Sequence, residues 1–149
     1  MTIILRRCAG ESELLDPALT GEFAKEMALV AAQSQVEPWC GYVAWETGVP
    51  LGFGGFKGPP DDAGRVEIGY LTFPNAIGRG VATTVARALL EIAGSNGAVT
   101  VVAHTLPEAN ASTRVLENAG FERDGWGTDE DVGDVWRWRV ELCEPSSER

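Results

Sequence analysis

The hydrophobic positions in the first third of the chain predict an edge strand, a helical stretch and a hairpin. Residues 2–8 alternate loosely, as an edge strand does, and residues 12–33 place apolar side chains at spacings of three and four. Two strands are predicted at 41–46 and 51–56, and the Thr-Gly-Val-Pro segment between them has the residue types of a hairpin turn. This part of the chain therefore supplies one side of a sheet.

Residues 65–120 alternate between strands and helices. Residues 65–73 predict a strand in the middle of the sheet, and residues 79–93 predict a helix with one apolar stripe. The β-branched run at 98–105 predicts a buried strand. Thr105-Leu106-Pro107-Glu108 has the pattern of a capping box, so we expect a helix to begin there and to end at Gly120.

Two final strands are predicted near 121–125 and 135–142, around an acidic loop. The order of these elements predicts an α/β (α+β) fold, a mixed sheet with helices on both of its faces. A chain of 149 residues fits one domain, so we expect residues 1–149 to form a single unit.

Composition excludes several classes of protein. Hydrophobic residues make up 44% and charged residues 23%, which is ordinary for a folded domain, and no apolar run approaches the length of a membrane helix. A net charge of −10 repels phosphate backbones and favours cations, so a nucleic-acid partner is not expected. Three widely spaced cysteines predict reduced thiols in a cytoplasmic protein, without a disulfide framework or a metal site.

The segment Gly78–Thr83 carries the clearest chemical signal, because small residues open a helix directly after a strand and a short loop. The free amides of a first helical turn, with the helix dipole, suit a pyrophosphate, and Arg79 could add a charged contact. Neither the phosphate-loop pattern GxxxxGK[ST] nor the dinucleotide pattern GxGxxG matches here. Taken in isolation, the glycines could equally serve only tight packing.

Three segments together resemble the GNAT superfamily of acyl-CoA N-acyltransferases. Ile77-Gly78-Arg79-Gly80-Val81-Ala82 is similar to its [QR]xxGx[GA] loop, Val66–Tyr70 to its central strand, and Glu108–Phe121 to its N.S.RVLE..GF segment. The resemblance covers about residues 41–142, and the branch with the ribosomal-protein N-terminal acetyltransferases is the most similar. It implies a mostly antiparallel sheet in which one parallel strand pair splays apart around acetyl-CoA.

The resemblance also implies the site. Acetyl-CoA would lie between the strands around Tyr70 and His104, and an amine would attack its thioester directly in a ternary complex. A backbone N–H near Leu71 would stabilise the oxyanion. The residues implied for the cosubstrate are Leu71, Thr72 and Phe73 for the pantetheine arm, Gly78, Arg79, Gly80, Val81, Ala82 and Thr83 for the pyrophosphate, and Asn110 and Ser112 in the following helix. A homodimer is a further implication.

Two residues are candidates for accepting the proton of the amine. Glu67 lies on the same face of its strand as Gly69, and its alternative role is to position a neighbour or face solvent. His104, the only histidine, changes charge near neutral pH but could equally be structural. Two positions depart from the family pattern, because Ile77 replaces a polar residue and Leu116 replaces a tyrosine acid; Tyr70 or Ser112 could substitute for that acid.

The last hairpin suggests where the acceptor binds. It carries five acidic residues beside Trp126, Trp136 and Trp138, which favours either an acidic, aromatic mouth for a cationic amine or a solvated loop beside core tryptophans. The acceptor could be a peptide N-terminus, a polyamine, an aminoglycoside or an amino acid. Three hypotheses follow in this order: an acetyl-CoA-dependent N-acetyltransferase, a non-catalytic acetyl-CoA-binding sensor or scaffold, and an interaction protein whose glycine loop is only structural.

Overall fold

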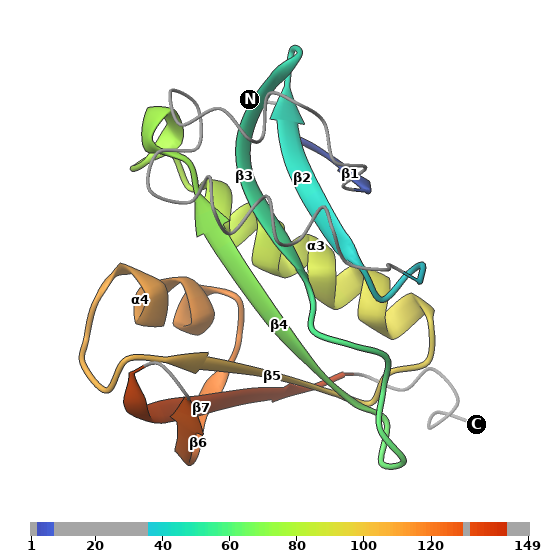
Figure 1. The fold of residues 1–149 in the computed structure, drawn as a ribbon, viewed down its shortest axis with the longest axis vertical. Helices are drawn as coiled ribbons and strands as arrows, with labels where there is room; N and C mark the ends of the chain where they lie inside the picture. The colour runs from blue at the N-terminus through green and yellow to red at the C-terminus, as the bar shows by residue number, and fades with distance from the viewer. Residues whose placement is uncertain (1–2, 8–35, 130–131, 143–149) are drawn as a thin grey trace.

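A computed structural model describes residues 3–7, 36–129 and 132–142, and they form one seven-stranded sheet in the order β1-β2-β3-β4-β5-β7-β6 (Figure 1). The elements are β1 Ile4–Arg7, β2 Gly41–Glu46, β3 Val49–Phe56, β4 Arg65–Thr72, the 3-10 turn η3 Pro74–Ala76, α3 Val81–Ser95, β5 Thr100–Thr105, α4 Ala111–Asn118, β6 Glu122–Asp129 and β7 Gly133–Glu141. The edge strands are β1 and β6.

One strand pair in this sheet is parallel, and it separates early. Strand β4 pairs with β5 only from Arg65 to Glu67, opposite Thr100 to Val102, while the other neighbouring strands pair antiparallel. Beyond those three pairs β4 and β5 diverge, so the sheet opens as a V toward their C-terminal ends (Figure 1). The mixed, mostly antiparallel sheet with a splayed parallel pair is therefore confirmed.

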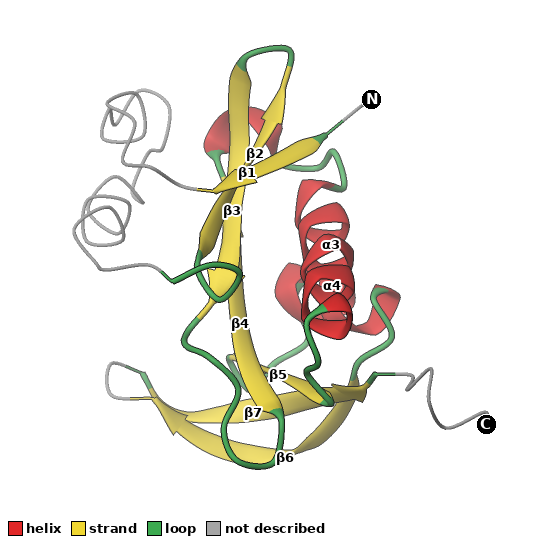
Figure 2. Ribbon diagram, turned by 90° about the vertical axis from the view of Figure 1, so that its right-hand side faces the viewer, coloured by secondary structure: helices red, strands yellow, loops and turns green. Residues whose placement is uncertain are grey.

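Helices α3 and α4 lie on the same face of the sheet (Figure 2). Val85 and Leu89 of α3 are fully buried in the main core, as is Leu116 of α4. The helical stretch expected at 12–33, on which the prediction of helices on both faces depends, lies outside the described residues. In the described part of the chain, no helix is long and apolar enough to cross a membrane.

The predicted capping box at Thr105–Glu108 is wrong, because α4 begins six residues later, at Ala111. Asn110 caps it instead: its side-chain oxygen accepts from the Thr113 amide at 3.0 Å, and its own amide donates to Thr113 Oγ1 at 2.9 Å. The Thr105 hydroxyl accepts a buried bond from Trp138 Nε1 at 3.0 Å. The Thr105 hydroxyl is therefore used in a tertiary hydrogen bond with Trp138 and not as a helix cap.

The other boundaries moved where glycines adopt left-handed backbone angles. The β2–β3 turn contains only Thr47 and Gly48, with φ of 48° and 81°, so β3 begins at Val49, two residues before the predicted start. Such primed turns match the twist of the two strands that they join. Strand β6 runs to Asp129, four residues beyond the prediction, because a bulge at 124–125 lets the pairing continue.

Helix α3 packs so closely on β3 that Gly54 leaves no room for a side chain. A methyl group there would lie 2.3 Å from Val85 Cγ1 and 3.2 Å from Leu89 Cδ1. We expect Gly54→Ala to lower the free energy of unfolding by about 1–3 kcal/mol, as overpacked cores do. Urea unfolding measures this, with Gly58→Ala as the control because, in the described part of the chain, only its own sequence neighbours come within 4 Å of its Cβ position. Equal stability of the two variants would contradict the packing described.

Candidate functional site

The start of helix α3 forms an open pocket with uncapped amides. Gly78 and Gly80 have φ of 86° and 76°, and no side chain caps the helix at Gly80 among the described residues. The first-turn amides therefore remain available to an anion. The pocket has a volume of about 520 Å³ and is lined by Thr72, Ala76, Ile77, Gly78, Gly80, Val81, Ala82, Thr83, Ala111, Arg114, Val115 and Asn118. The structure thus gathers the small residues of the loop around a cavity.

Arg79 does not line this pocket. Its guanidinium donates to Glu46 Oε1 at 2.5 Å, across to the end of β2. Arg114 of α4 is among the residues that line the loop's cavity. The sequence suggested Arg79 as the source of a positive charge at this pocket. In the structure Arg114 provides that charge.

The V between β4 and β5 leaves backbone groups of β4 without a neighbouring strand. The backbone amide of Lys57 donates to the Glu67 carbonyl at 2.9 Å, and the backbone amide of Phe73 donates to the Leu51 carbonyl at 2.9 Å. Both bonds belong to the continuous register between β3 and β4. Because strand residues alternate in direction, Glu67, Gly69, Leu71 and Phe73 turn their backbone groups toward β3. By the same alternation Ile68, Tyr70 and Thr72 turn their backbone groups toward the β5 side, and Ile68 is the first of them beyond the paired segment.

This differs from the expectation for Leu71 and Phe73. The Leu71 carbonyl lies 2.7 Å from where a Gly52 methyl group would stand, which places it on the β3 side. The Phe73 carbonyl accepts from Ala76 at 2.9 Å in the turn that follows β4. Of the three residues expected to contact the pantetheine arm through their backbone, only Thr72 turns its backbone groups toward the gap. The backbone groups of Tyr70, which was not among the three, also face it.

Tyr70 and Ser112 meet on the helix face of the gap. The Tyr70 hydroxyl donates to the Ser112 carbonyl at 3.0 Å and also lies 3.0 Å from Ser112 Oγ. Burial raises the pKa of Tyr70, and its hydrogen bond with Ser112 opposes that shift, so the phenol stays protonated at neutral pH. Leu116, at the position of the family's tyrosine acid, is fully buried in the core. Tyr70 and Ser112, the two residues that the sequence suggested as substitutes for the tyrosine acid, are therefore in contact.

Glu67 and His104, 37 residues apart, form one pair on the opposite face of the sheet. Glu67 Oε2 lies 2.8 Å from His104 Nδ1 and 3.4 Å from Lys57 Nζ. Both members of the pair are about one-third exposed, at 34% for Glu67 and 28% for His104. They line a cavity of about 570 Å³ with Lys57, Thr105, Leu106, Thr128, Asp129, Val132 and Val135.

The β6–β7 hairpin forms one wall of this cavity and holds the histidine ring. A methyl group added at Gly127 would stand 2.9 Å from both Cδ2 and Nε2 of His104. The ring is therefore enclosed between the Glu67 carboxylate and the backbone of β6. Asp129 adds a second carboxylate to the cavity. Sequence reasoning missed Lys57 and Gly127, which no local pattern distinguishes.

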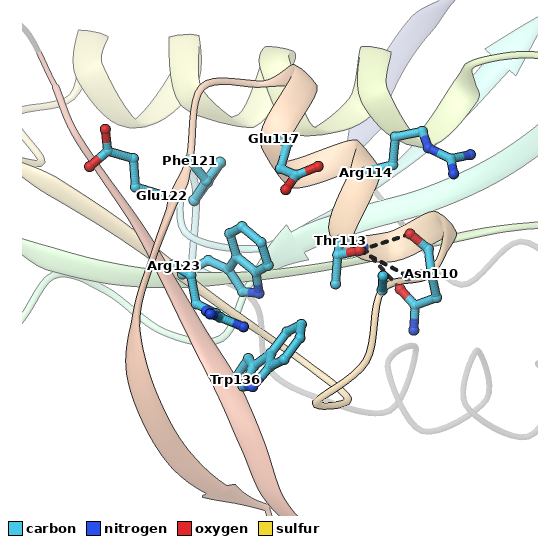
Figure 3. A pocket seen from close by; sticks show the side chains of 10 residues that line it. Asn110, Thr113, Arg114, Glu117, Phe121, Glu122, Arg123 and Trp136 are labelled. Carbon is cyan, nitrogen blue, oxygen red and sulfur yellow. Dashed lines mark hydrogen bonds between the residues drawn. The ribbon is translucent and has the colours of Figure 1, made fainter.

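The tryptophans of this hairpin lie away from the Glu67 cavity. Trp136 and Trp138 pack on the main core and line a separate hollow between α4 and the hairpin, where Arg123 stacks 4.1 Å above the Trp136 ring (Figure 3). Trp126 pairs directly with Trp136 and so shares its face of the sheet. Of the two interpretations of these tryptophans, the core one holds for Trp138, and Trp136 packs against the same core while partly exposed.

Two other expected residues have structural partners. Asp124, one of the acidic residues of the hairpin, lies 3.4 Å from Arg137 and 3.7 Å from Arg139, so its charge is matched within the sheet. Asn110 lines the hollow of Figure 3 and caps α4 through Thr113, as the dashed bonds there show. The cap fixes the start of α4, and with it the position of Ser112 against Tyr70.

Comparisons with known proteins show the family of the chain. Residues 6–122 match the family model described as acetyltransferase (GNAT) domain. No curated protein matches the chain by sequence.

Solved structures share its fold at low identity. A spermidine N-acetyltransferase chimera from Vibrio cholerae and hSSAT has a TM-score of 0.78 at 16% identity, over 95% of this chain and 96% of that one. Aminoglycoside acetyltransferase AAC(6')-Ib in complex with coenzyme A has 0.71 at 23%, over 94% and 95%. A phosphinothricin acetyltransferase from Sinorhizobium meliloti with AcCoA has 0.74 at 18%, over 100% and 93%. With the family match over most of its length, the chain belongs to the GNAT acetyltransferase domain family.

Proposed function

We propose that this protein is an acetyl-CoA-dependent N-acetyltransferase that moves an acetyl group to a primary amine by direct transfer. One observation carries the proposal: the open edge of β4 joins an anion pocket on the helix face to the Glu67–His104 pair on the other face. A thioester in the gap would meet its cosubstrate-binding groups on one side and a proton acceptor on the other. Two solved relatives contain coenzyme A or AcCoA.

The residues present fit acetyl-CoA. The amides of Val81, Ala82 and Thr83 would bind the pyrophosphate, with Arg114 nearby as a cation. The gap-facing backbone groups of Tyr70 and Thr72 would pair with the amides of the pantetheine arm, as an exposed strand edge pairs with a peptide.

Glu67 would accept the proton of the attacking amine, directly or through water. His104 would hold the carboxylate in place through Nδ1. The amide of Tyr70 is the first gap-facing amide wholly beyond the paired segment, and we assign it as the oxyanion donor expected near Leu71. The Tyr70 hydroxyl, protonated at neutral pH, would return a proton to the CoA thiolate as it leaves.

The acceptor would be an amine that is cationic in solution. The cavity beside the open gap has two carboxylates, Glu67 and Asp129, against the one ammonium of Lys57, and this excess of negative charge favours an ammonium group. The named substrates of the solved relatives are spermidine, an aminoglycoside and phosphinothricin, all of them small amines. A peptide N-terminus, as the ribosomal-protein branch would imply, meets the same chemical requirement.

Calorimetric titration with acetyl-CoA, followed by a thiol assay for CoA release with a panel of amines, tests this function. We expect saturable binding of acetyl-CoA and release of CoA with at least one class of amine. If the protein did not bind acetyl-CoA, the proposed acetyltransferase activity would be rejected, and the chain would have the acetyltransferase fold without that activity.

A non-catalytic acetyl-CoA-binding module is the second candidate. It is favoured by Leu116, which puts a fully buried aliphatic side chain where the family pattern has a tyrosine acid. Such a module would bind acetyl-CoA but release no CoA with any amine. Turnover that falls sharply when Glu67 is changed would exclude it.

Gly127 offers a test of the His104 ring position. We expect Gly127→Ala to lower turnover by about tenfold with unchanged acetyl-CoA affinity, because small misplacements of catalytic groups are costly. The double variant with His104→Ala should lose no more activity than His104→Ala alone, since the added methyl group acts through the ring. Steady-state kinetics measures both, and additive losses would show that Gly127 acts in another way.

A further inference from the structure

The proposed proton acceptor already has a primary amine beside it. Lys57 follows β3 directly, and its backbone amide donates to the Glu67 carbonyl at 2.9 Å, which holds the two residues opposite each other. Its side chain runs along β4, with Cε 3.5 Å from the Cβ position of Gly69, and ends 3.4 Å from Glu67 Oε2. Glu67 and Gly69 share this face of β4.

The location of this amine is the one that an acceptor must occupy. Strand β4 loses its β5 partner after Glu67, and the Lys57 side chain passes Gly69, two residues beyond that point, at the edge of the open gap. Lys57 also lines the cavity that contains Glu67 and His104. An acceptor amine must meet three conditions. It must lie on the face of the sheet that carries Glu67 and His104, it must reach the gap between β4 and β5, and it must contact the base.

We propose that Lys57 is a self-acetylation site, an inference that rests on the proposed acetyl-CoA-dependent function. The Lys57 ammonium gives a proton to Glu67, and the neutral nitrogen attacks the acetyl carbonyl of acetyl-CoA. A C–N bond forms and the C–S bond breaks. The CoA sulfur leaves with the electron pair and takes up a proton, so the products are N-acetyl-Lys57, free CoA and one proton released to solvent.

Two features make this reaction accessible to the side chain. Lys57 is 60% exposed, so its terminal atoms can rotate from the carboxylate toward the gap without repacking the core. The ion pair with Glu67 is between partly exposed groups, and such pairs contribute little to stability. Breaking it therefore adds little to the barrier.

Incubation of the protein with isotopically labelled acetyl-CoA, followed by peptide mass spectrometry, tests the inference. The chain contains one other lysine, Lys25, which reports the background of uncatalysed chemical acetylation. We expect labelling at Lys57 to be faster than at Lys25 and first order at all protein concentrations, as an intramolecular reaction requires. Glu67→Gln should slow labelling at Lys57 by about 10²-fold and leave Lys25 unchanged.

Two further variants complete the design. Ala82→Glu, which puts a carboxylate in the anion pocket, should reduce Lys57 labelling to the Lys25 background. Lys57→Arg keeps the positive charge beside Glu67 and should remove the labelled peptide without loss of acetyl-CoA binding. Labelling of Lys57 at the Lys25 rate, or labelling unaffected by Ala82→Glu, would overturn the inference.

Failure of the inference is distinguishable from failure of the proposed function. If the wild type binds acetyl-CoA and acetylates an added amine while Lys57 remains unlabelled, self-acetylation alone is rejected. If calorimetry detects no acetyl-CoA binding, the proposed function is rejected and the inference with it.

Discussion

Replacing Glu67 by glutamine is expected to lower kcat by about 10²- to 10⁴-fold, the usual contribution of a positioned general base. Glutamine keeps the length of the side chain and can still accept a hydrogen bond from His104 Nδ1, so the pair should remain in place. The amide oxygen cannot take up the proton of the amine. Steady-state kinetics should therefore show a fall in kcat, and calorimetry an unchanged affinity for acetyl-CoA.

Glu108→Gln is a matched control for this change. It removes the same charge from an exposed position before α4 that lines none of the cavities described above, so its kinetics should resemble those of the wild type. Full activity of Glu67→Gln would contradict the role assigned to Glu67. In that event a loss in His104→Gln would identify the imidazole as the proton acceptor.

Ala82→Glu is expected to weaken acetyl-CoA binding by about 10²-fold or more. Ala82 lines the anion pocket in the first turn of α3, so the new carboxylate would face the pyrophosphate. Juxtaposed like charges cost several kcal/mol, and about 2.7 kcal/mol corresponds to 10²-fold in Kd. The fold should be retained, because a carboxylate at a helix N-terminus stabilises the helix by about 0.3–1 kcal/mol.

The control for this prediction is Thr84→Glu. Thr84 is in the same turn and is exposed, but it does not line the pocket. Both variants carry the same added charge and should unfold near the wild-type temperature. Calorimetric titration then compares their affinities, and equal binding by Ala82→Glu and Thr84→Glu would place the pyrophosphate elsewhere.

Local patterns in the sequence predicted most of the elements. The periodicities of the segments at 41–46, 65–73 and 79–93 depend on neighbours within a few residues, and the strands and the helix formed there with boundaries that match or differ by up to about two residues. The glycine loop was readable as a place where small residues open a helix, and its left-handed Gly78 and Gly80 line a pocket there.

The errors arose where distant residues compete for a local group. The Thr105 hydroxyl satisfied a capping pattern, yet Trp138, 33 residues later, uses it in a buried hydrogen bond. Strand β6 contains three exposed charges and a left-handed glycine, so its pairing with β7 had little local signal. The face of the sheet on which the Trp136 side chain lies is determined by the register of β7 with β5 and β6, which the local sequence does not show.

By itself, the sequence determined the family, the order of the strands and helices, and the loop at Gly78–Thr83, because these depend on short-range spacing. Tertiary structure alone decided that Glu67 meets His104 and Lys57, and that Tyr70 meets Ser112. It also decided which backbone groups of β4 face the gap, because strand alternation assigns them only once the partner of β4 on each side is known. Side chains far apart in the chain come together only through the sheet, and no local pattern encodes their separation.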